Sequence, residues 1–301
     1  GTTGITNLPS INSGQIGGRR NIIINGAQEV DQRHAGASVA ASAVYVTDRW
    51  KVQAAGNAGD AEQIDSTIAG FKSSLKYTGD ANIAFMQMGQ QIEFKNYAHL
   101  VGEDVTISFY AKANNTNGGS TALTVRTRTV TGEDGSALFA GANTDTSVTI
   151  STTAARYTVA RTIPADSKGF SLEFALGAHV NTDGLEITGI QLELGTVTEF
   201  EHRSFGEELA LCQRYYQTLL GIGIAGYASG ASESIMGHYQ FHQTMRAAPT
   251  VTITNNGTTS RFTSIGVNTS TAESASFQFV ANGAGFAGVY GATAGNAVSE
   301  L

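Results

Sequence analysis

The sequence contains a single cysteine, Cys212, among its 301 residues. An intrachain disulfide is therefore impossible, and no cysteine cluster can hold a metal ion. Proline occurs only three times and tryptophan once. No apolar run approaches the ~20 residues that a membrane-spanning helix needs, so we expect no membrane insertion. Stability must come from burial of apolar side chains or from association with other chains.

Basic residues are also scarce: Lys and Arg number 18 against 25 Asp and Glu, for a net charge of -7. A protein that binds nucleic acid usually carries a basic stripe, and the largest basic cluster is Arg19-Arg20. We therefore expect no nucleic-acid partner. The chain has no signal-peptide pattern, and because it begins at Gly1 we expect a fragment or a processed product.

What the chain does have is 36 glycines and many Thr, Ser, Val and Asn residues, which favour strands and turns. A short apolar run at Asn21–Gly26 and a segment at Val44–Val52 are the first predicted strands. Later segments alternate with period two, as half-buried strands do. The later predictions are strands at Gln91–Phe94, Val105–Lys112, Ala122–Val130, Thr146–Ile150, Arg156–Thr162, Gly169–Leu176 and Leu185–Leu194. Eight to ten short strands indicate an all-β sandwich or jelly roll.

One segment, Phe205–Tyr216, has a different pattern. Acidic residues come early and Arg214 comes late, as the helix dipole favours, and Leu209, Cys212 and Tyr216 fall at helical spacing. We predict one short helix here. Its position makes Cys212 a buried small hydrophobe rather than a nucleophile.

These features divide the chain into four parts. Residues 1–18 are predicted to be an N-terminal arm or linker, because their isolated apolar residues cannot offset the ordering entropy. Residues 19–204 form the jelly-roll domain, and 205–220 the connecting helix. Residues 221–301 return to β composition and predict a smaller C-terminal β domain, with one sheet of about five strands and a thin core.

Motifs for catalysis are weak or missing. Gly221–Gly226 fits G-x-G-x-x-G but follows a helix and leads into a strand, the reverse of a dinucleotide site. His238 and His242 are four apart, which on a strand separates them by ~13 Å, too far to share one ion. Three acids on predicted strands are expected to face outward: Glu173, Glu186 and Glu193. We therefore predict no enzyme activity, no catalytic residue, no cofactor and no metal site.

Aromatic residues are the remaining candidates for ligand contact, because flat rings stack on the apolar faces of sugars. Trp50 lies in a regular strand and is expected in the core. Five tyrosines are possible contacts that the sequence does not rank: Tyr110, Tyr157, Tyr227, Tyr239 and Tyr290. The ligand-binding residues thus stay unassigned.

Six strings in order resemble a module of bacteriophage fibre and appendage proteins. They are Asn21–Gly26 with Gln32-Arg33 and Asp48–Trp50, Val105–Ala113, Arg156–Thr158, Ile187–Gly195 with Phe200–Arg203, Glu208–Tyr216, and Met245–Val251. Glu208–Tyr216 is nearly the most distinctive string of that family. The resemblance covers about residues 19 to 254. It implies a jelly roll similar to carbohydrate-binding modules, then a helix, then a small β domain.

The resemblance also implies partners. Such fibres are usually homotrimers, and the N-terminal arm would join other virion structural proteins. Related enzyme-associated modules often bind calcium near an aspartate pair in the closing strand, where this chain has Glu186–Gly189, so no metal is expected. The leading interpretation is a non-enzymatic phage tail fibre or receptor-binding protein in the virion, contacting host-surface glycans or another envelope component through weak, multivalent sites. A capsid fibre or decoration protein, and a carbohydrate-binding module of a larger glycoside hydrolase, remain as alternatives.

Overall fold

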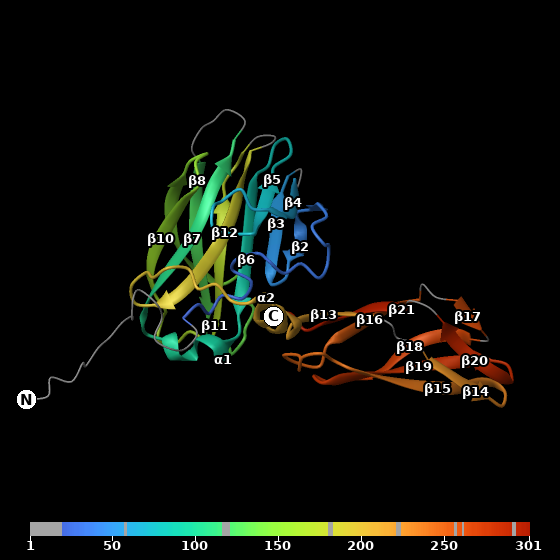
Figure 1. Ribbon diagram of the computed structural model, residues 1–301. Coiled ribbons are helices and arrows are strands. Elements are labelled where there is room, and N and C mark those ends of the chain that lie inside the picture. Colours follow the sequence, from blue (N-terminus) through green and yellow to red (C-terminus); the bar gives the residue numbers. More distant parts are fainter. Residues whose placement is uncertain are drawn as a thin grey trace, which may run out of the picture.

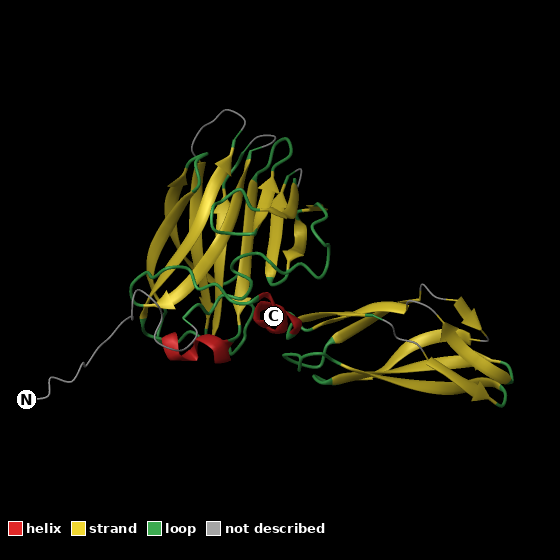
Figure 2. Cartoon of the chain, in the orientation of Figure 1, coloured by secondary structure: helices red, strands yellow, loops and turns green. Residues whose placement is uncertain are grey.

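The structure is a computed structural model that describes residues 20–56, 59–115, 121–179, 183–220, 224–255, 258–260, 262–290 and 293–301. The predicted arm at residues 1–18 lies outside the described residues. Between residues 39 and 194, two six-stranded antiparallel sheets form a β-sandwich (Figures 1 and 2). The predicted all-β jelly-roll fold is confirmed.

We name each sheet by a central strand. The β12 sheet has the order β1 (Val39–Ala40), β4 (Asp60–Asp65), β5 (Ser73–Thr78), β12 (Gly184–Leu194), β7 (Asp104–Asn114) and β10 (Ala155–Thr162). The β11 sheet has the order β2 (Ser42–Thr47), β3 (Trp50–Ala55), β6 (Phe85–Ile92), β11 (Gly169–Leu176), β8 (Thr121–Val130) and β9 (Ala142–Ile150).

The core between the sheets is aromatic at its centre. Trp50 is fully buried, as predicted, and its ring lies 6.2 Å from that of Phe174. Phe109 meets Phe174 edge to face at 4.8 Å. The indole Nε1 of Trp50 donates to the carbonyl of Asn25 at 3.0 Å, so its one polar atom is satisfied inside the core.

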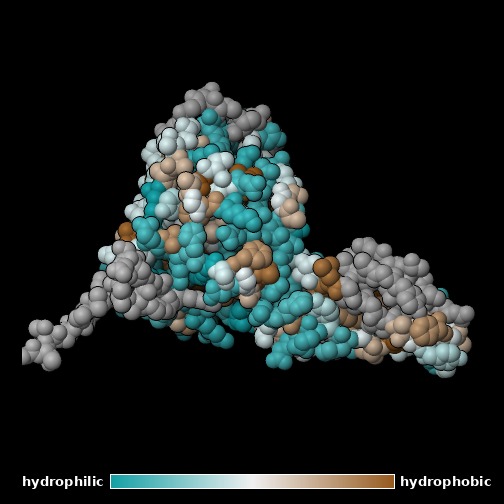
Figure 3. Space-filling view, in the orientation of Figure 1, coloured by the Kyte–Doolittle hydropathy of each residue, from teal (hydrophilic) through white to brown (hydrophobic). Residues whose placement is uncertain are grey.

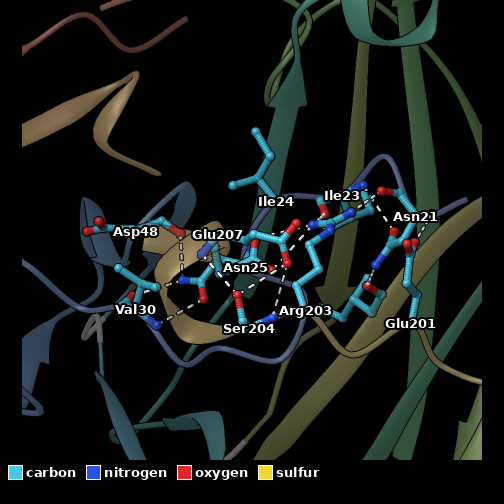
Figure 4. A network of polar contacts seen from close by, with 12 residues as sticks. Asn21, Ile23, Ile24, Asn25, Val30, Asp48, Glu201, Arg203, Ser204 and Glu207 are labelled. Carbon is cyan, nitrogen blue, oxygen red and sulfur yellow. Dashed lines mark hydrogen bonds and ion pairs between the residues drawn. The ribbon is translucent and has the colours of Figure 1, made fainter. Parts of the chain in front are cut away.

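The predicted strand at Asn21–Gly26 is wrong, because this segment is irregular. Its asparagine side chains take the hydrogen bonds that a neighbouring strand would make. Asn21 Oδ1 accepts from Ile23 N at 3.0 Å, and Asn25 Nδ2 donates to the carbonyls of Val30 and Asp48 at 2.8 and 2.9 Å. Short amide side chains compete with the backbone ladder in this way. Figure 4 shows these contacts.

Two other strand predictions need correction. Val44–Val52 is not one strand, because Arg49, with φ +71, turns the chain between β2 and β3. Gln91–Phe94 is also not a strand throughout: β6 ends at Ile92, and α1 (Phe94–Tyr97) and η1 (Ala98–Leu100) follow. Glu93 lies between β6 and α1 and accepts hydrogen bonds from the side chains of Arg214 and Tyr215. A local sequence pattern cannot show contacts between residues so far apart in the chain.

The predicted helix is α2 (Phe205–Gln213), which ends three residues earlier than expected. Ser204 and Glu207 form a reciprocal capping box at its start. Tyr216 lies in β13 instead, because its backbone pairs with Val298. Cys212 is fully buried, as predicted, and burial raises the pKa of its thiol well above the usual value.

After α2, nine strands form three three-stranded antiparallel sheets where one sheet of about five strands was predicted. Their orders are β13 (Tyr216–Leu219), β21 (Thr293–Val298) and β16 (Thr250–Asn255); β14 (Ile224–Ala228), β20 (Gly285–Tyr290) and β17 (Thr258–Ser260); and β15 (Ala231–Gln240), β19 (Ser274–Asn282) and β18 (Phe262–Ser270). Glycine hides the alternation of β20 and β21, because a residue without a side chain marks neither face of a strand. Within the described residues, no helix is long and apolar enough to cross a membrane.

Candidate functional site

The outward face of the β11 sheet gathers polar side chains from four adjoining strands. Core residues such as Met86 and Met88 alternate with outward residues along β6, so Phe85 and Gln87 point away from the core. Strand pairing then sets Gln87 opposite Ala175 of β11, and Ala175 opposite Thr124 of β8. Residues that are far apart in sequence thereby form one row across the sheet.

This row lies in a groove of about 300 Å³. The groove is lined by Phe85, Gln87, Thr124, Arg126, Ala175, Leu176 and Gly177. Ala175 and Gly177 leave the floor of the groove open, because neither has a large side chain. At the edge of the groove, Phe85 is 37% exposed. The groove therefore combines an aromatic wall with polar groups over an open floor, as small-ligand sites do.

Arg126 is the fixed cation of this groove. Its Nε and Nη2 donate to the two carboxylate oxygens of Asp145 on β9 at 2.8 and 2.7 Å, and its Nη1 donates to Gln87 Oε1 at 3.4 Å. Asn143 adds a third hydrogen bond to Asp145 at 3.0 Å. The Arg126 hydrogen bonds lower the pKa of Asp145 to about 2, and the same pair raises the pKa of Arg126. The guanidinium is held in place before any ligand arrives.

Beside the groove, Glu173 lies on the outward face of β11, as predicted, but it is fully buried. Its carboxylate accepts from Arg128 Nε at 3.0 Å and from the backbone N–H of Phe139 at 2.7 Å. This contact draws the connection between β8 and β9 over the sheet, where Leu138 lies above Gly89. A Cβ on Gly89 would come within 2.9 Å of Leu138 Cδ1, so only glycine fits. That connection covers the sheet at Gly89, beyond the residues of the groove.

Glu186 and Glu193 also lie on the face opposite the core, as predicted, but both are buried. Glu186 accepts from the backbone and hydroxyl of Thr67 and pairs with Lys112 at 3.2 Å. Glu193 accepts from the backbone and hydroxyl of Thr198. Both carboxylates fasten loops across the β12 sheet, a role that a period-two pattern cannot distinguish from an exposed acid.

The other candidate residues lie apart from the groove. Tyr110 and Tyr157 pack at half-buried positions on the β12 sheet, against Phe71 and Phe109 respectively. Tyr227 is exposed on β14 and Tyr239 is half-buried on β15; Tyr290 belongs to β20. None of the four tyrosines whose side chains are described lines the groove.

The weak motifs take the following positions. His238 lies on β15 and His242 beyond its end. Gly221–Gly223 lie outside the described residues, and β14 begins at Ile224. In the described part of the chain, no group of three or more His, Cys, Asp or Glu residues is placed to hold a metal ion.

Sequence reasoning missed Phe85, Gln87 and Arg126 as site residues. Phe85 and Gln87 lay outside the predicted strand at Gln91–Phe94, so their shared face was not visible. The alternation of Ala122–Val130 did place Arg126 on an outward face. That signal alone did not distinguish Arg126 from any other exposed strand residue.

Several solved structures are similar to part of this chain. The enzymatically active domain of tailspike protein 4 of bacteriophage CBA120 matches with 15% identity over 58% of this chain, and the match spans 21% of that chain (TM-score 0.41). The module TmCBM61, solved with beta-1,4-galactotriose, matches with 11% identity over 59% of this chain and 100% of its own (TM-score 0.38). A CBM4 structure matches with 18% identity over 57% and 98% (TM-score 0.37). No family profile and no curated protein matches the sequence.

Proposed function

We propose that this chain binds glycans through the outward face of the β11 sheet, as a non-enzymatic part of a bacteriophage virion appendage such as a tail fibre. The groove at Phe85, Gln87 and Arg126 carries the proposal. A sugar ring presents a C–H face and a rim of hydroxyls. The exposed ring of Phe85 can stack on the C–H face, and the amide of Gln87 and the guanidinium of Arg126 can form hydrogen bonds with the hydroxyls.

The arrangement of Arg126 favours binding over loose attraction. Two of its nitrogens, Nε and Nη2, are engaged by Asp145, so little side-chain entropy is lost when Nη1 donates to a ligand. Gln87 meets that same nitrogen only at 3.4 Å, so a sugar hydroxyl can compete for it. Because Asp145 neutralises the charge of Arg126, we expect this face to recognise a sugar through hydrogen bonds rather than through net charge.

Two observations support a non-enzymatic role for this face. Hydrolysis of a glycosidic bond usually needs one carboxyl group that is protonated and one that is ionised, both able to reach the sugar. Asp145 has a pKa lowered to about 2 by Arg126, so at neutral pH it is ionised and cannot serve as the acid. Glu173 is fully buried beneath Arg128 and the backbone of Phe139.

The strands after α2 support a homotrimer. Within the bounds of β13–β21 the only Asp, Glu, Lys or Arg is Glu233, and depletion of charge is typical of interface cores. Tyr227 and Phe286 are cross-strand partners on β14 and β20, exposed by 74% and 59%. Figure 3, in the same orientation as Figure 1, shows hydrophobic residues near the end of the molecule where β14 and β20 lie. Three copies would also repeat a weak glycan site and raise avidity.

A polysaccharide screen tests the proposal. The full chain is passed over immobilised bacterial surface polysaccharides, and retention is measured together with the release of reducing ends. We expect retention on at least one polysaccharide with no new reducing ends. Release of reducing ends would contradict the non-enzymatic role, and the absence of retention on every surface would contradict glycan binding.

A further inference from the structure

A second hollow, separate from the groove, lies where the first described residues meet α1, η1 and α2. Its volume is about 280 Å³, which is close to the lower size of small-ligand sites. It is lined by Asn21, Ile22, Ile24, Lys95, Asn96, His99, Arg203 and Leu211. It shares no lining residue with the groove on the β11 sheet.

The described lining residues include cations and amides but no acid. Lys95 and Asn96 belong to α1 and His99 to η1, and all three side chains are exposed. Arg203 comes from the segment before α2. One face of the hollow thus presents ammonium, amide and imidazole groups, while Ile22, Ile24 and Leu211 supply an apolar side.

Arg203 is nearly enclosed, with a side chain only 5% exposed. Its Nη1 donates to the carbonyl of Ile23 at 2.9 Å and to Glu208 at 3.2 Å, and its Nη2 donates to the carbonyl of Asn21. Figure 4 shows the side chain between Ile23 and Asn21. Its Nε is buried and has no hydrogen-bond partner among the described residues. A buried donor without an acceptor is costly, and Nε is the one nitrogen of Arg203 that the described residues leave unsatisfied.

The acids nearest to this hollow are already engaged. Glu208 is bound by Arg203 and by the backbone N–H of Asn25 at 2.6 Å, and Glu201 accepts from the backbone of Asn21 at 2.7 Å. Glu208 offsets the charge of Arg203, so Lys95 is the lining residue that carries a charge with no ion-pair partner among the described residues, while the carboxylate of Glu201 lies outside the lining. A neighbouring hollow of about 420 Å³ shares His99 and is lined by both Arg20 and Glu193.

From these contacts we propose a second binding site, which takes a small ligand bearing an oxyanion, either a carboxylate or a phosphate. Lys95 supplies the charge, Asn96 and His99 supply hydrogen bonds, and Arg203 fixes the wall with an unsatisfied donor. The apolar side of Ile22 and Leu211 accommodates the rest of a ligand the size of a monosaccharide. The site acts independently of the glycan groove.

Calorimetric titration of the full chain tests this site with three probes of similar size: glucuronate, glucose 6-phosphate and glucose. We expect at least one of the two anions to bind and glucose to bind far more weakly. Binding of glucuronate alone identifies a carboxylate site, and binding of glucose 6-phosphate alone a phosphate site. Failure of both anions, or equal binding of glucose, would overturn the proposal.

Substitutions of the lining residues test whether the anion binds in this hollow. Lys95→Gln removes an exposed charge that makes no structural contact among the described residues, and should weaken anion binding about fivefold to tenfold. Lys168→Gln, also exposed, is the matched control and should bind as the wild type does. Anion binding that is unchanged in Lys95→Gln and in His99→Gln would contradict this location. Phe85→Ala should leave anion binding unchanged, which separates this site from the glycan groove.

Discussion

The guanidinium of Arg49 lies 3.7 Å from the ring centroid of Tyr215, which connects the turn between β2 and β3 to the residues after α2. The same guanidinium pairs with the carboxylate of Glu300, and Arg33 binds the other oxygen of that carboxylate at 2.6 Å. Burial by itself would lower the pKa of Arg49, but Glu300, Tyr215, Tyr45 and Cys212 together outweigh burial and raise it. The sandwich and the strands after α2 are therefore joined by a buried ionic contact.

Replacement of Glu300 by Gln should destabilise this joint. Two arginines would lose their shared carboxylate, and breaking a buried ion pair costs about 3 kcal/mol or more. We expect a lower unfolding temperature and an earlier transition for the strands after α2, both measured by scanning calorimetry. Glu233→Gln, at an exposed carboxylate, is the control and should change little. Equal thermograms for the two variants would show that the joint contributes no stability.

Asp48 should make stability depend on pH. Burial raises the pKa of this carboxyl group from 3.8 to about 6 despite the hydrogen bonds from Gln32. The folded chain therefore binds this proton more tightly than the unfolded chain does. The contribution of Asp48 is most favourable below about pH 4 and is lost as the pH rises through 6.

The test compares urea unfolding at pH 5 and pH 7.5. Between these values the wild type should lose ~1.4 kcal/mol through Asp48. Asp48→Asn should show a smaller difference between the two pH values, because the side chain no longer ionises. A variant with the same pH slope as the wild type would contradict the assignment.

Gly26 should not tolerate a side chain. A Cβ there would lie 2.1 Å from the carbonyl oxygen of Ile190, whose backbone is fixed in β12. Gly26→Ala should lower the free energy of unfolding by ~2 kcal/mol or more, since the crowding falls on backbone atoms. Gly206, in α2, has open space, and Gly206→Ala should be neutral or stabilising by ~0.5 kcal/mol. Chemical denaturation of the two variants gives the comparison.

The proposed homotrimer predicts a mass of three chains in light scattering after size exclusion. Because Tyr227 and Phe286 are exposed by more than half, Tyr227→Asp combined with Phe286→Asp should reduce the mass to that of a monomer. Circular dichroism provides the check that the variant remains folded. A wild-type monomer at micromolar concentration would contradict the trimer.

Local pattern was sufficient for much of the fold. β7, β8, β11 and β12 fall close to the predicted ranges, because each alternates or forms a continuous apolar run over at least eight residues. The helix was visible from its acids and its helical spacing, and Trp50 proved to be core. These features depend only on neighbours in sequence, which a single chain displays.

The rest depends on partners far apart in sequence. Glu93 is held by Arg214, 121 residues away, and Glu173 by Arg128, 45 residues away. Without those partners each acid is indistinguishable from an exposed one. The groove has the same origin: Phe85 and Arg126 belong to β6 and β8, which become neighbours across a single strand only because β11 inserts between them. No local pattern encodes that order.

The most direct test of glycan binding compares two exposed phenylalanines. Phe85→Ala removes the aromatic wall of the groove, and Phe286→Ala removes an exposed ring of β20. On a polysaccharide that retains the wild type, we predict that Phe85→Ala loses retention, with affinity reduced about tenfold, and that Phe286→Ala keeps the same affinity per chain. Retention of Phe85→Ala at the wild-type level would contradict the assignment of the binding face.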